Sequence, residues 1–127
     1  MTAPTLRKRE RMVSRKLIET LFGGGSLSMA AFPLRVVFMK KGRTEYDSPI
    51  EILISVPKKR FKHAVDRNRV KRQVREAYRH HKQQLYDALP ADQQLLLAFV
   101  WLSDQHISTK EVEKRVCNLL QRMPEKL

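Results

Sequence analysis

Cysteine, aromatic residues and acidic residues are all scarce in this chain of 127 residues. The single cysteine, Cys117, excludes an intramolecular disulfide and a zinc site built from several cysteines, and it fits a reducing compartment. Because Cys117 lies beside Val116 and Leu119, we expect it to be buried and to pack as a small apolar residue. The sequence assigns it no other role. Aromatic residues are only 7% of the chain, so few rings are available for stacking.

Long apolar runs are also missing. No stretch approaches the roughly 20 apolar residues that a membrane span needs. The basic N-terminus is followed by an amphipathic stretch and three glycines at 23–25, where a secretory signal would carry an uninterrupted apolar region. We therefore expect a cytoplasmic protein with no membrane partner.

The length predicts one domain, residues 1–127, in which residues 1–13 form a flexible basic tail.

Lysine and arginine number 26 against 13 acidic residues, which gives a net charge of +13. The excess is concentrated in residues 58–82, where eleven bases and two acids sum to +9. The charged side chains on a solvated helix face usually alternate between positive and negative, and those of this stretch do not. The concentration favours contact with a polyanion, with nucleic acid as the first candidate and an anionic membrane surface as the second.

Hydrophobic periodicity predicts three helices and three strands. The expected elements are a helix over 14–22 capped by Ser14, strands over 33–39 and 50–56, a long helix over 67–85 capped by Asp66, a strand over 94–102, and a helix that begins at the capping box of Ser108 and Glu111. This order, α-β-β-α-β-α, predicts a small α+β sandwich. The helix between the second and third strands suggests that these two strands are parallel.

The long helix divides into an apolar and a basic face when its residues are placed about 100° apart. The apolar face carries Val70, Val74, Ala77, Tyr78, His81 and Leu85. The adjacent face carries Asn68 and five cations, Lys71, Arg72, Arg75, Arg79 and Lys82. Like charges four residues apart destabilise an isolated helix by about a few tenths of a kcal/mol per pair, which binding to phosphates would offset. A-form RNA presents closely spaced phosphates and 2′-hydroxyls to such side chains.

Three residues of this helix have competing interpretations. Asn68 is as well suited to capping a helix as to contacting RNA. Tyr78 and His81 fit the edge of a packed core better than a catalytic role. Hydrolysis of a phosphodiester by the protein itself needs clustered carboxylates or a pair of histidines, but the acids are scattered and His80 and His81 point about 100° apart. We therefore expect no catalytic residue and no metal ligand on this chain.

The segment KKRFKHAVDRNRVKRQVREAYR, residues 58–79, resembles the signature of the bacterial ribonuclease P protein family. That signature, K-K-x4-A-x2-R-N-R-[IV]-K-R-x2-R-[EQ], is met at every fixed position. The segment RERMVSRKLIETLFGGG is similar to the family's N-terminal segment, in which basic residues precede an apolar and aromatic helix and a glycine. The chain length and the order of elements also agree with the family.

The resemblance implies a small α+β sandwich with a left-handed β-α-β crossover, an exception to the usual right-handed rule. It implies an accessory subunit of ribonuclease P, an endoribonuclease whose catalytic centre lies on a large RNA that removes the 5′ leader of precursor tRNA. The implied partners are ribonuclease P RNA and precursor tRNA, with no DNA expected. Magnesium would be bound mainly by the RNA, with no cofactor on the protein.

By motif position, the resemblance assigns RNA contacts to residues of the signature, and neighbouring cations complete the expected RNA-binding set: Lys58, Lys59, Arg60, Lys62, Arg67, Asn68, Arg69, Lys71, Arg72, Arg75 and Arg79. The leader cleft would be lined by Ile18, Phe22, Arg35 and Val37. Family members often have two aromatic residues four apart in the first helix. Phe22 matches the second, but Ile18 stands at the first and offers only apolar contact. Which face of the first predicted strand meets the leader stays open.

Two interpretations from different classes therefore remain. The first is a ribonuclease P subunit that assists removal of the leader. The second is a non-catalytic ribosomal or RNA-structuring protein, which would not require this spacing of cations. A DNA-binding helix-turn-helix is a weaker third option, because it needs two adjacent helices joined by a short turn and the basic helix is flanked by strands.

Overall fold

Four strands form one sheet in the spatial order β1-β2-β4-β3 in the computed structural model, which describes residues 15–45 and 47–127. The elements along the chain are α1 (Arg15–Phe22), β1 (Leu27–Ala31), β2 (Leu34–Gly42), β3 (Ile50–Ser55), α2 (Ala64–His81), α3 (Gln83–Ala88), β4 (Gln93–Trp101), α4 (Thr109–Arg122) and a terminal 3-10 turn (Met123–Lys126). The expected basic tail and the Ser14 cap lie outside the described residues.

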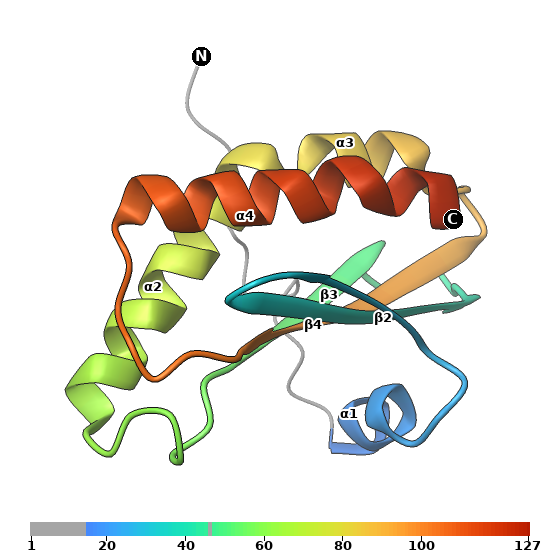
Figure 1. Ribbon diagram of the computed structural model, residues 1–127. Coiled ribbons are helices and arrows are strands. Elements are labelled where there is room, and N and C mark those ends of the chain that lie inside the picture. The colour runs from blue at the N-terminus through green and yellow to red at the C-terminus, as the bar shows by residue number, and fades with distance from the viewer. Residues whose placement is uncertain (1–14, 46) are drawn as a thin grey trace.

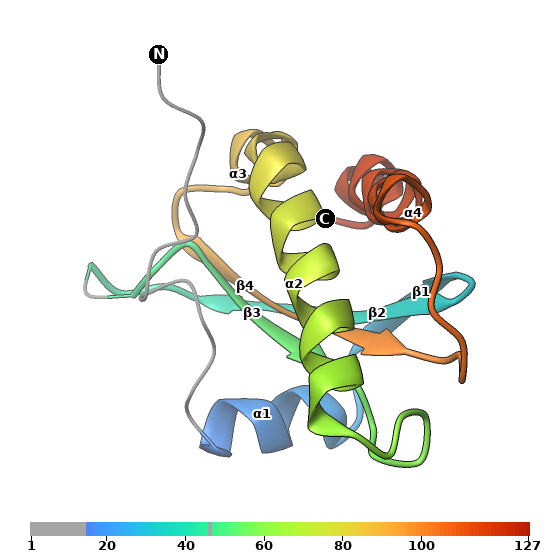
Figure 2. The same ribbon diagram turned by 90° about the vertical axis from the view of Figure 1, so that its left-hand side faces the viewer.

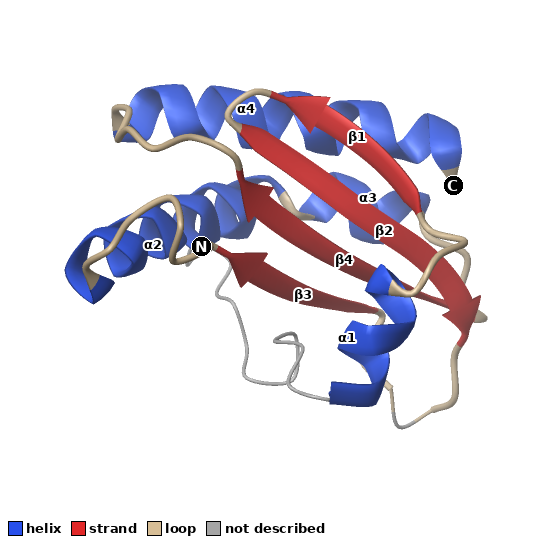
Figure 3. Ribbon diagram, turned by 60° about the horizontal axis from the view of Figure 1, so that its bottom comes forward, coloured by secondary structure: helices blue, strands red, loops and turns tan. Residues whose placement is uncertain are grey.

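Helices cover both faces of the sheet, which confirms the α+β class. In Figure 1, α2, α3 and α4 lie on one face and α1 lies on the other. β3 pairs with β4 in parallel, as expected, with Ile50 opposite Leu95 and Ser55 opposite Val100. Figure 3 views the sheet from the α1 side, with α2 and α3 behind it. The arrows of β3 and β4 both point to the left of this view and β4 lies above β3, so an observer looking along β3 toward its arrowhead finds β4 on the right. The crossover is therefore left-handed.

The core is divided by the sheet into a large and a small cluster. Alternate residues of the strands, such as Ile52 and Phe99, pack under α2, α3 and α4 in the large cluster. The opposite set, including Val37 and Ala98, packs under Leu21 of α1 in the small cluster. β4 lies between two strands and contributes to both clusters, which explains its continuous apolar sequence.

The apolar face of α2 is buried as its periodicity predicts. Val70, Val74, Ala77 and Tyr78 are at most 3% exposed. Gln73 is also buried, and its Nε2 donates hydrogen bonds to the Ile107 carbonyl and the Thr109 hydroxyl at 3.1 Å each. This anchoring sets the rotation of α2 and leaves Asn68, Arg69 and Arg72 exposed on its other side.

Strand β1 is absent from the sequence-based prediction. Its sequence, LSMAA, is short and has little β-branched or aromatic content. It forms because β2 offers an open edge with which it pairs in antiparallel register, from Leu27 opposite Phe38 to Ala31 opposite Leu34. The structure therefore has one strand more than the sequence predicts, and this strand precedes the first predicted one.

Both predicted ends of the long helix are wrong. α2 begins at Ala64, and its N-cap residue is His63 rather than Asp66. It ends at His81, and α3 follows as a separate short helix that carries the buried Leu85. Lys82, expected on the exposed basic face, lies at this junction and is 8% exposed, with Nζ 5.6 Å from the centroid of a tyrosine ring.

Two local expectations concern α4, and the structure bears out the first. The Ser108 side chain accepts a hydrogen bond from the backbone N–H of Glu111, so it caps the helix as predicted. Cys117 is half-buried rather than fully buried.

In the part of the chain that the structure describes, no helix has both the length and the apolar character needed to cross a membrane.

Replacing Val74 by alanine tests the anchoring of α2. Because the Val74 side chain is fully buried, its truncation leaves a cavity, and we expect the free energy of unfolding to fall by about 1–3 kcal/mol in urea titrations. Arg72→Ala on the exposed side of the same helix is the matched control, with an expected change within about 0.5 kcal/mol. Equal unfolding midpoints for Val74→Ala and the unmodified protein would show that α2 is not held by this face.

Candidate nucleic-acid interface

The exposed face of α2 forms a stripe of polar and cationic side chains. Asn68, Arg69 and Arg72 are exposed, and Lys71 and Arg75 are half-buried beside them. Figure 2 looks onto α2, which crosses in front of the sheet with its full length uncovered on this side. The stripe, defined as these five residues, follows from the burial of the opposite face of the helix.

Residues 57–63, here called the basic loop, join β3 to α2 and extend the stripe. Lys58, Lys59 and Lys62 are exposed in this loop. None of the three makes an ion pair with another described residue. Arg60 differs, because its Nη1 lies 3.4 Å from the Asp104 carboxylate. Phe61 differs too, because it is 8% exposed and belongs to the large core cluster.

Within the Arg67-Asn68-Arg69 motif, the guanidinium of Arg67 is engaged by the chain itself. Its Nη1 donates hydrogen bonds to the backbone carbonyls of Phe61 and Lys62, both at 2.9 Å. Arg67 therefore holds the end of the basic loop against the first turns of α2, whereas Asn68 and Arg69 remain exposed.

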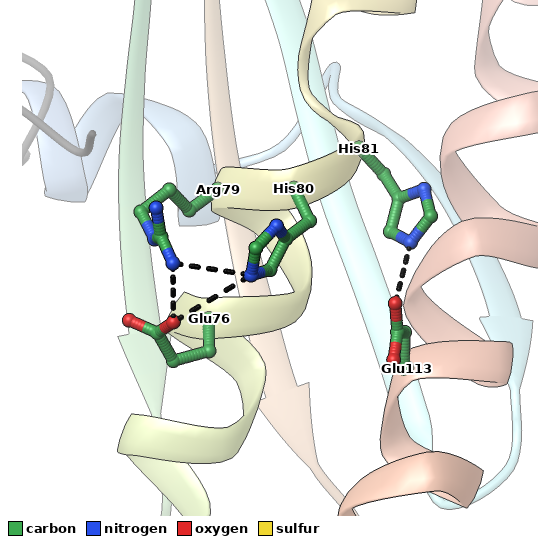
Figure 4. Close-up of polar contacts among 5 residues, drawn as sticks. All are labelled: Glu76, Arg79, His80, His81 and Glu113. Atoms are coloured by element: carbon green, nitrogen blue, oxygen red, sulfur yellow. Dashed lines mark hydrogen bonds and ion pairs between the residues drawn. The ribbon is translucent and has the colours of Figure 1, made fainter. Parts of the chain in front are cut away.

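The C-terminal end of α2 carries cations that are already paired, as Figure 4 shows. Arg79 Nη2 donates to Glu76 at 2.8 Å, and His80 Nε2 lies 3.8 Å from the same carboxylate. The hydrogen bond from Arg79 is the main cause that lowers the pKa of Glu76. Glu76 therefore stays charged and offsets part of the positive charge at this end of the helix.

His80 and His81 point to different partners, as their spacing predicts. His81 Nε2 lies 2.9 Å from Glu113 Oε1 and links α2 to α4 (Figure 4). His81 is half-buried at the edge of the core, whereas His80 is exposed beside Glu76. Among residues 15–45 and 47–127, no three His, Cys, Asp or Glu side chains are grouped so as to hold a metal ion.

The residues expected in the leader cleft lie on the α1 side of the sheet, where Val37 packs in the small core cluster with Leu21 of α1. Val37 and Ile18 pack together in the small core cluster, and Val37 is only 8% exposed. Arg35 is exposed on the same strand, where its Nε donates to the Ser28 hydroxyl at 3.2 Å. Phe22, at the end of α1, is 48% exposed. Phe22 and Arg35 therefore offer more surface to a ligand than Ile18 and Val37.

The two candidate surfaces lie on the same side of the molecule. The basic loop and the start of α2 reach past the edge of the sheet, so part of the α1-side sheet face lies between them and α1 (Figures 1 and 3). Half-buried Leu53 and Ser55 of β3 belong to this face. Glu51 is an acidic residue of the same strand face, and burial chiefly, with repulsion from Asp47, raises its pKa.

Two residues that the sequence did not indicate contact the basic loop from residues 102–108, the segment between β4 and α4. Asp104 pairs with Arg60, and the His106 ring stacks on Phe61 with centroids 4.4 Å apart. His106 Nε2 also lies 3.0 Å from Asp66 Oδ1. No local pattern in the sequence signals these contacts, because the partners are 40 or more residues apart.

Comparisons with known proteins agree with the signature. The family described as Ribonuclease P matches residues 6–124. The ribonuclease P protein component of Porphyromonas gingivalis is 43% identical over 129 residues, covering 97% of this chain and 91% of the relative. That of Chlorobium phaeobacteroides is 40% identical over 84 residues, covering 65% of this chain and 57% of the relative.

Solved structures show the same fold. The RNase P protein of Staphylococcus aureus superposes with a TM-score of 0.68 at 19% identity, over 88% of this chain and 93% of the other. The RNase P protein of Thermotoga maritima gives a TM-score of 0.68 at 24% identity, over 89% and 96% of the two chains. Taken with the match over nearly the whole sequence, these findings show that the chain belongs to the ribonuclease P protein family, the protein components of the ribonucleoprotein that processes the 5′ ends of tRNA.

Proposed function

We propose that this chain binds ribonuclease P RNA through the basic loop and the stripe of α2, and that it holds the 5′ leader of precursor tRNA on the sheet face beside α1. The observation that carries the proposal is the continuity of exposed cations from Lys58 in the loop to Arg72 on the helix. Such a surface releases counterions when it neutralises phosphates, which is the main source of affinity in nucleic-acid binding.

The residues of this surface have different tasks in the proposal. Arg69 and Arg72 present planar guanidinium groups that can bind a phosphate through two hydrogen bonds, and Asn68 can donate to a phosphate or a 2′-hydroxyl. Lys58, Lys59 and Lys62 act as point charges. Arg60, Arg67 and Arg79 are partly committed to contacts within the protein, so we assign them smaller direct shares of the affinity.

The leader would lie between the basic loop and α1. Phe22 offers an exposed ring on which a base can stack, and Arg35 offers a cation for a neighbouring phosphate. Ile18 and Val37 would support the site by apolar packing rather than by stacking. Placing cations between two polyanions, the catalytic RNA and the leader, reduces the repulsion that would oppose substrate binding.

Catalysis belongs to the RNA in this proposal, and so does the magnesium that assists hydrolysis. The chemistry of the side chains supports this division, because the described residues bring no three candidate ligands together and Glu76 is held by Arg79. The chain's own contribution is to bind, orient and screen charge. The proposed compartment is the cytoplasm, because both partners are cellular RNA molecules.

Reconstitution tests the proposal directly. We expect the purified chain to stimulate cleavage of precursor tRNA by a bacterial ribonuclease P RNA when magnesium is too low for the RNA alone, measured as leader release in single-turnover assays. Screening of phosphate repulsion by the protein is the physical reason. Binding to unrelated ribosomal RNA without stimulation of cleavage would instead support the RNA-structuring alternative.

The role of the stripe is tested by Arg72→Ala. We expect the affinity for ribonuclease P RNA to fall and the slope of log Kd against log salt to decrease by about one, because one phosphate contact is lost. Lys110→Ala on α4 removes the same charge from another exposed site and should leave that slope unchanged. Equal slopes for Arg72→Ala and the unmodified protein would mean that Arg72 is only solvated.

The leader surface is tested by Phe22→Ala. We expect binding of leader-bearing precursor tRNA to the reconstituted complex to weaken by roughly tenfold, since base stacking on an aromatic ring contributes about 1–3 kcal/mol. Binding of mature tRNA should not change. Phe32→Ala, which alters an exposed ring between β1 and β2, is the control and should affect neither RNA. Equal losses for precursor and mature tRNA would assign Phe22 to the fold instead.

A further inference from the structure

The basic loop is held from one side by the segment that joins β4 to α4. We propose that His106, assisted by Asp104, is a positioning residue that fixes the basic loop in the shape in which its lysines meet RNA. The inference rests on the proposed function of the loop, and it assigns a role to a histidine that lies outside the signature. Two contacts connect this segment to the basic loop, and a third connects it to the first turn of α2.

The first contact is a stack between aromatic rings. The His106 ring lies 4.4 Å from the Phe61 ring, measured between centroids, with an angle of 14° between the planes. Phe61 is 8% exposed and belongs to the large core cluster. His106 therefore covers the one apolar side chain that anchors the middle of the basic loop. Lys59 and Lys62, on either side of this anchored part, point to solvent.

The second contact joins the same ring to α2. His106 Nε2 lies 3.0 Å from Asp66 Oδ1 in the first turn of the helix. A carboxylate can only accept, so Nε2 carries the proton of this hydrogen bond. His106 Nδ1 is buried and makes no hydrogen bond with the described residues. The polar link of the ring is therefore directed at Asp66, and the imidazole joins the end of the loop to the start of the helix.

Asp104 and Arg67 make further contacts with residues 60–62 of the loop. Arg60 Nη1 lies 3.4 Å from Asp104 Oδ1, but the aspartate side chain is 69% exposed, so this ion pair contributes little on its own. Arg67 Nη1 donates to the carbonyls of Phe61 and Lys62 from the helix side. Phe61 and its neighbours are thus held between His106 and Arg67, and the exposed lysines need little further ordering when RNA binds.

His106→Ala tests the role, and His81→Ala is the matched control. His81 makes a contact of the same kind, 2.9 Å from Glu113, but it joins α2 to α4 away from the basic loop. In the free protein, we expect faster amide hydrogen exchange over residues 58–63 in His106→Ala and unchanged exchange there in His81→Ala. Exchange measured by mass spectrometry reports the order of the loop without any RNA.

The second readout is RNA binding at several salt concentrations. We expect His106→Ala to weaken binding to ribonuclease P RNA by roughly three- to tenfold and to lower the salt slope by about one, although no lysine or arginine is removed. A purely structural loss of stability would lower the folded fraction and leave the slope of the folded protein unchanged. His81→Ala should retain the unmodified slope.

His106→Phe separates the two contacts and protects the test against a variant that fails to fold. Phenylalanine keeps the stack on Phe61 and loses the hydrogen bond to Asp66, so we expect loop exchange between that of the unmodified protein and that of His106→Ala. Unchanged exchange in both variants, or faster exchange with an unchanged slope and affinity, would overturn the positioning role. Failure of the unmodified protein to bind ribonuclease P RNA would overturn the proposed function instead.

Discussion

The packing of one face of α2 against the sheet and α4 is the constraint on which the rest of this structure depends. Val70, Val74 and Tyr78 are fully buried on that face. Their burial fixes the rotation of the helix, and the remaining positions must then point outward. The cations of the signature repel one another in solution, and the buried face holds them side by side despite this repulsion. In the proposed function, recognition of RNA by charge is therefore a consequence of hydrophobic anchoring on the opposite side of the same helix.

Much of the fold could be predicted because its strongest signals are local. The alternation in β3, the continuous apolar run of β4 and the capped start of α4 all appear where the sequence predicts them. β1 could not be predicted, because its residues have weak strand propensity and its stability comes from pairing with β2. The handedness of the crossover is also beyond local patterns, and here the family resemblance supplied what periodicity does not.

The sequence identifies the cations of the candidate site, but it does not show how each one is used. Arg79 donates to Glu76 and Arg67 donates to two carbonyls, while Lys82 is buried beside a tyrosine ring. The aspartate expected to cap α2 instead lies within 3.0 Å of His106, a partner 40 residues away. Because such contacts depend on how distant segments pack, no pattern along the chain reveals them. The sheet residues can be placed more fully from the sequence. Because side chains alternate between the two faces of a strand, knowing the face of one residue gives the face of the others.

In the account proposed above, the basic loop and α2 are held in place by their packing and present exposed cations to RNA from one side of the molecule. Chemical labelling of lysines in the complex with ribonuclease P RNA, read residue by residue by mass spectrometry, tests that claim most directly. Lys58, Lys59, Lys62 and Lys71 should become protected in the complex, and the exposed Lys110 and Lys114 of α4 should stay as reactive as in the free protein. Protection of the α4 lysines with continued labelling of the loop and α2 would contradict the account.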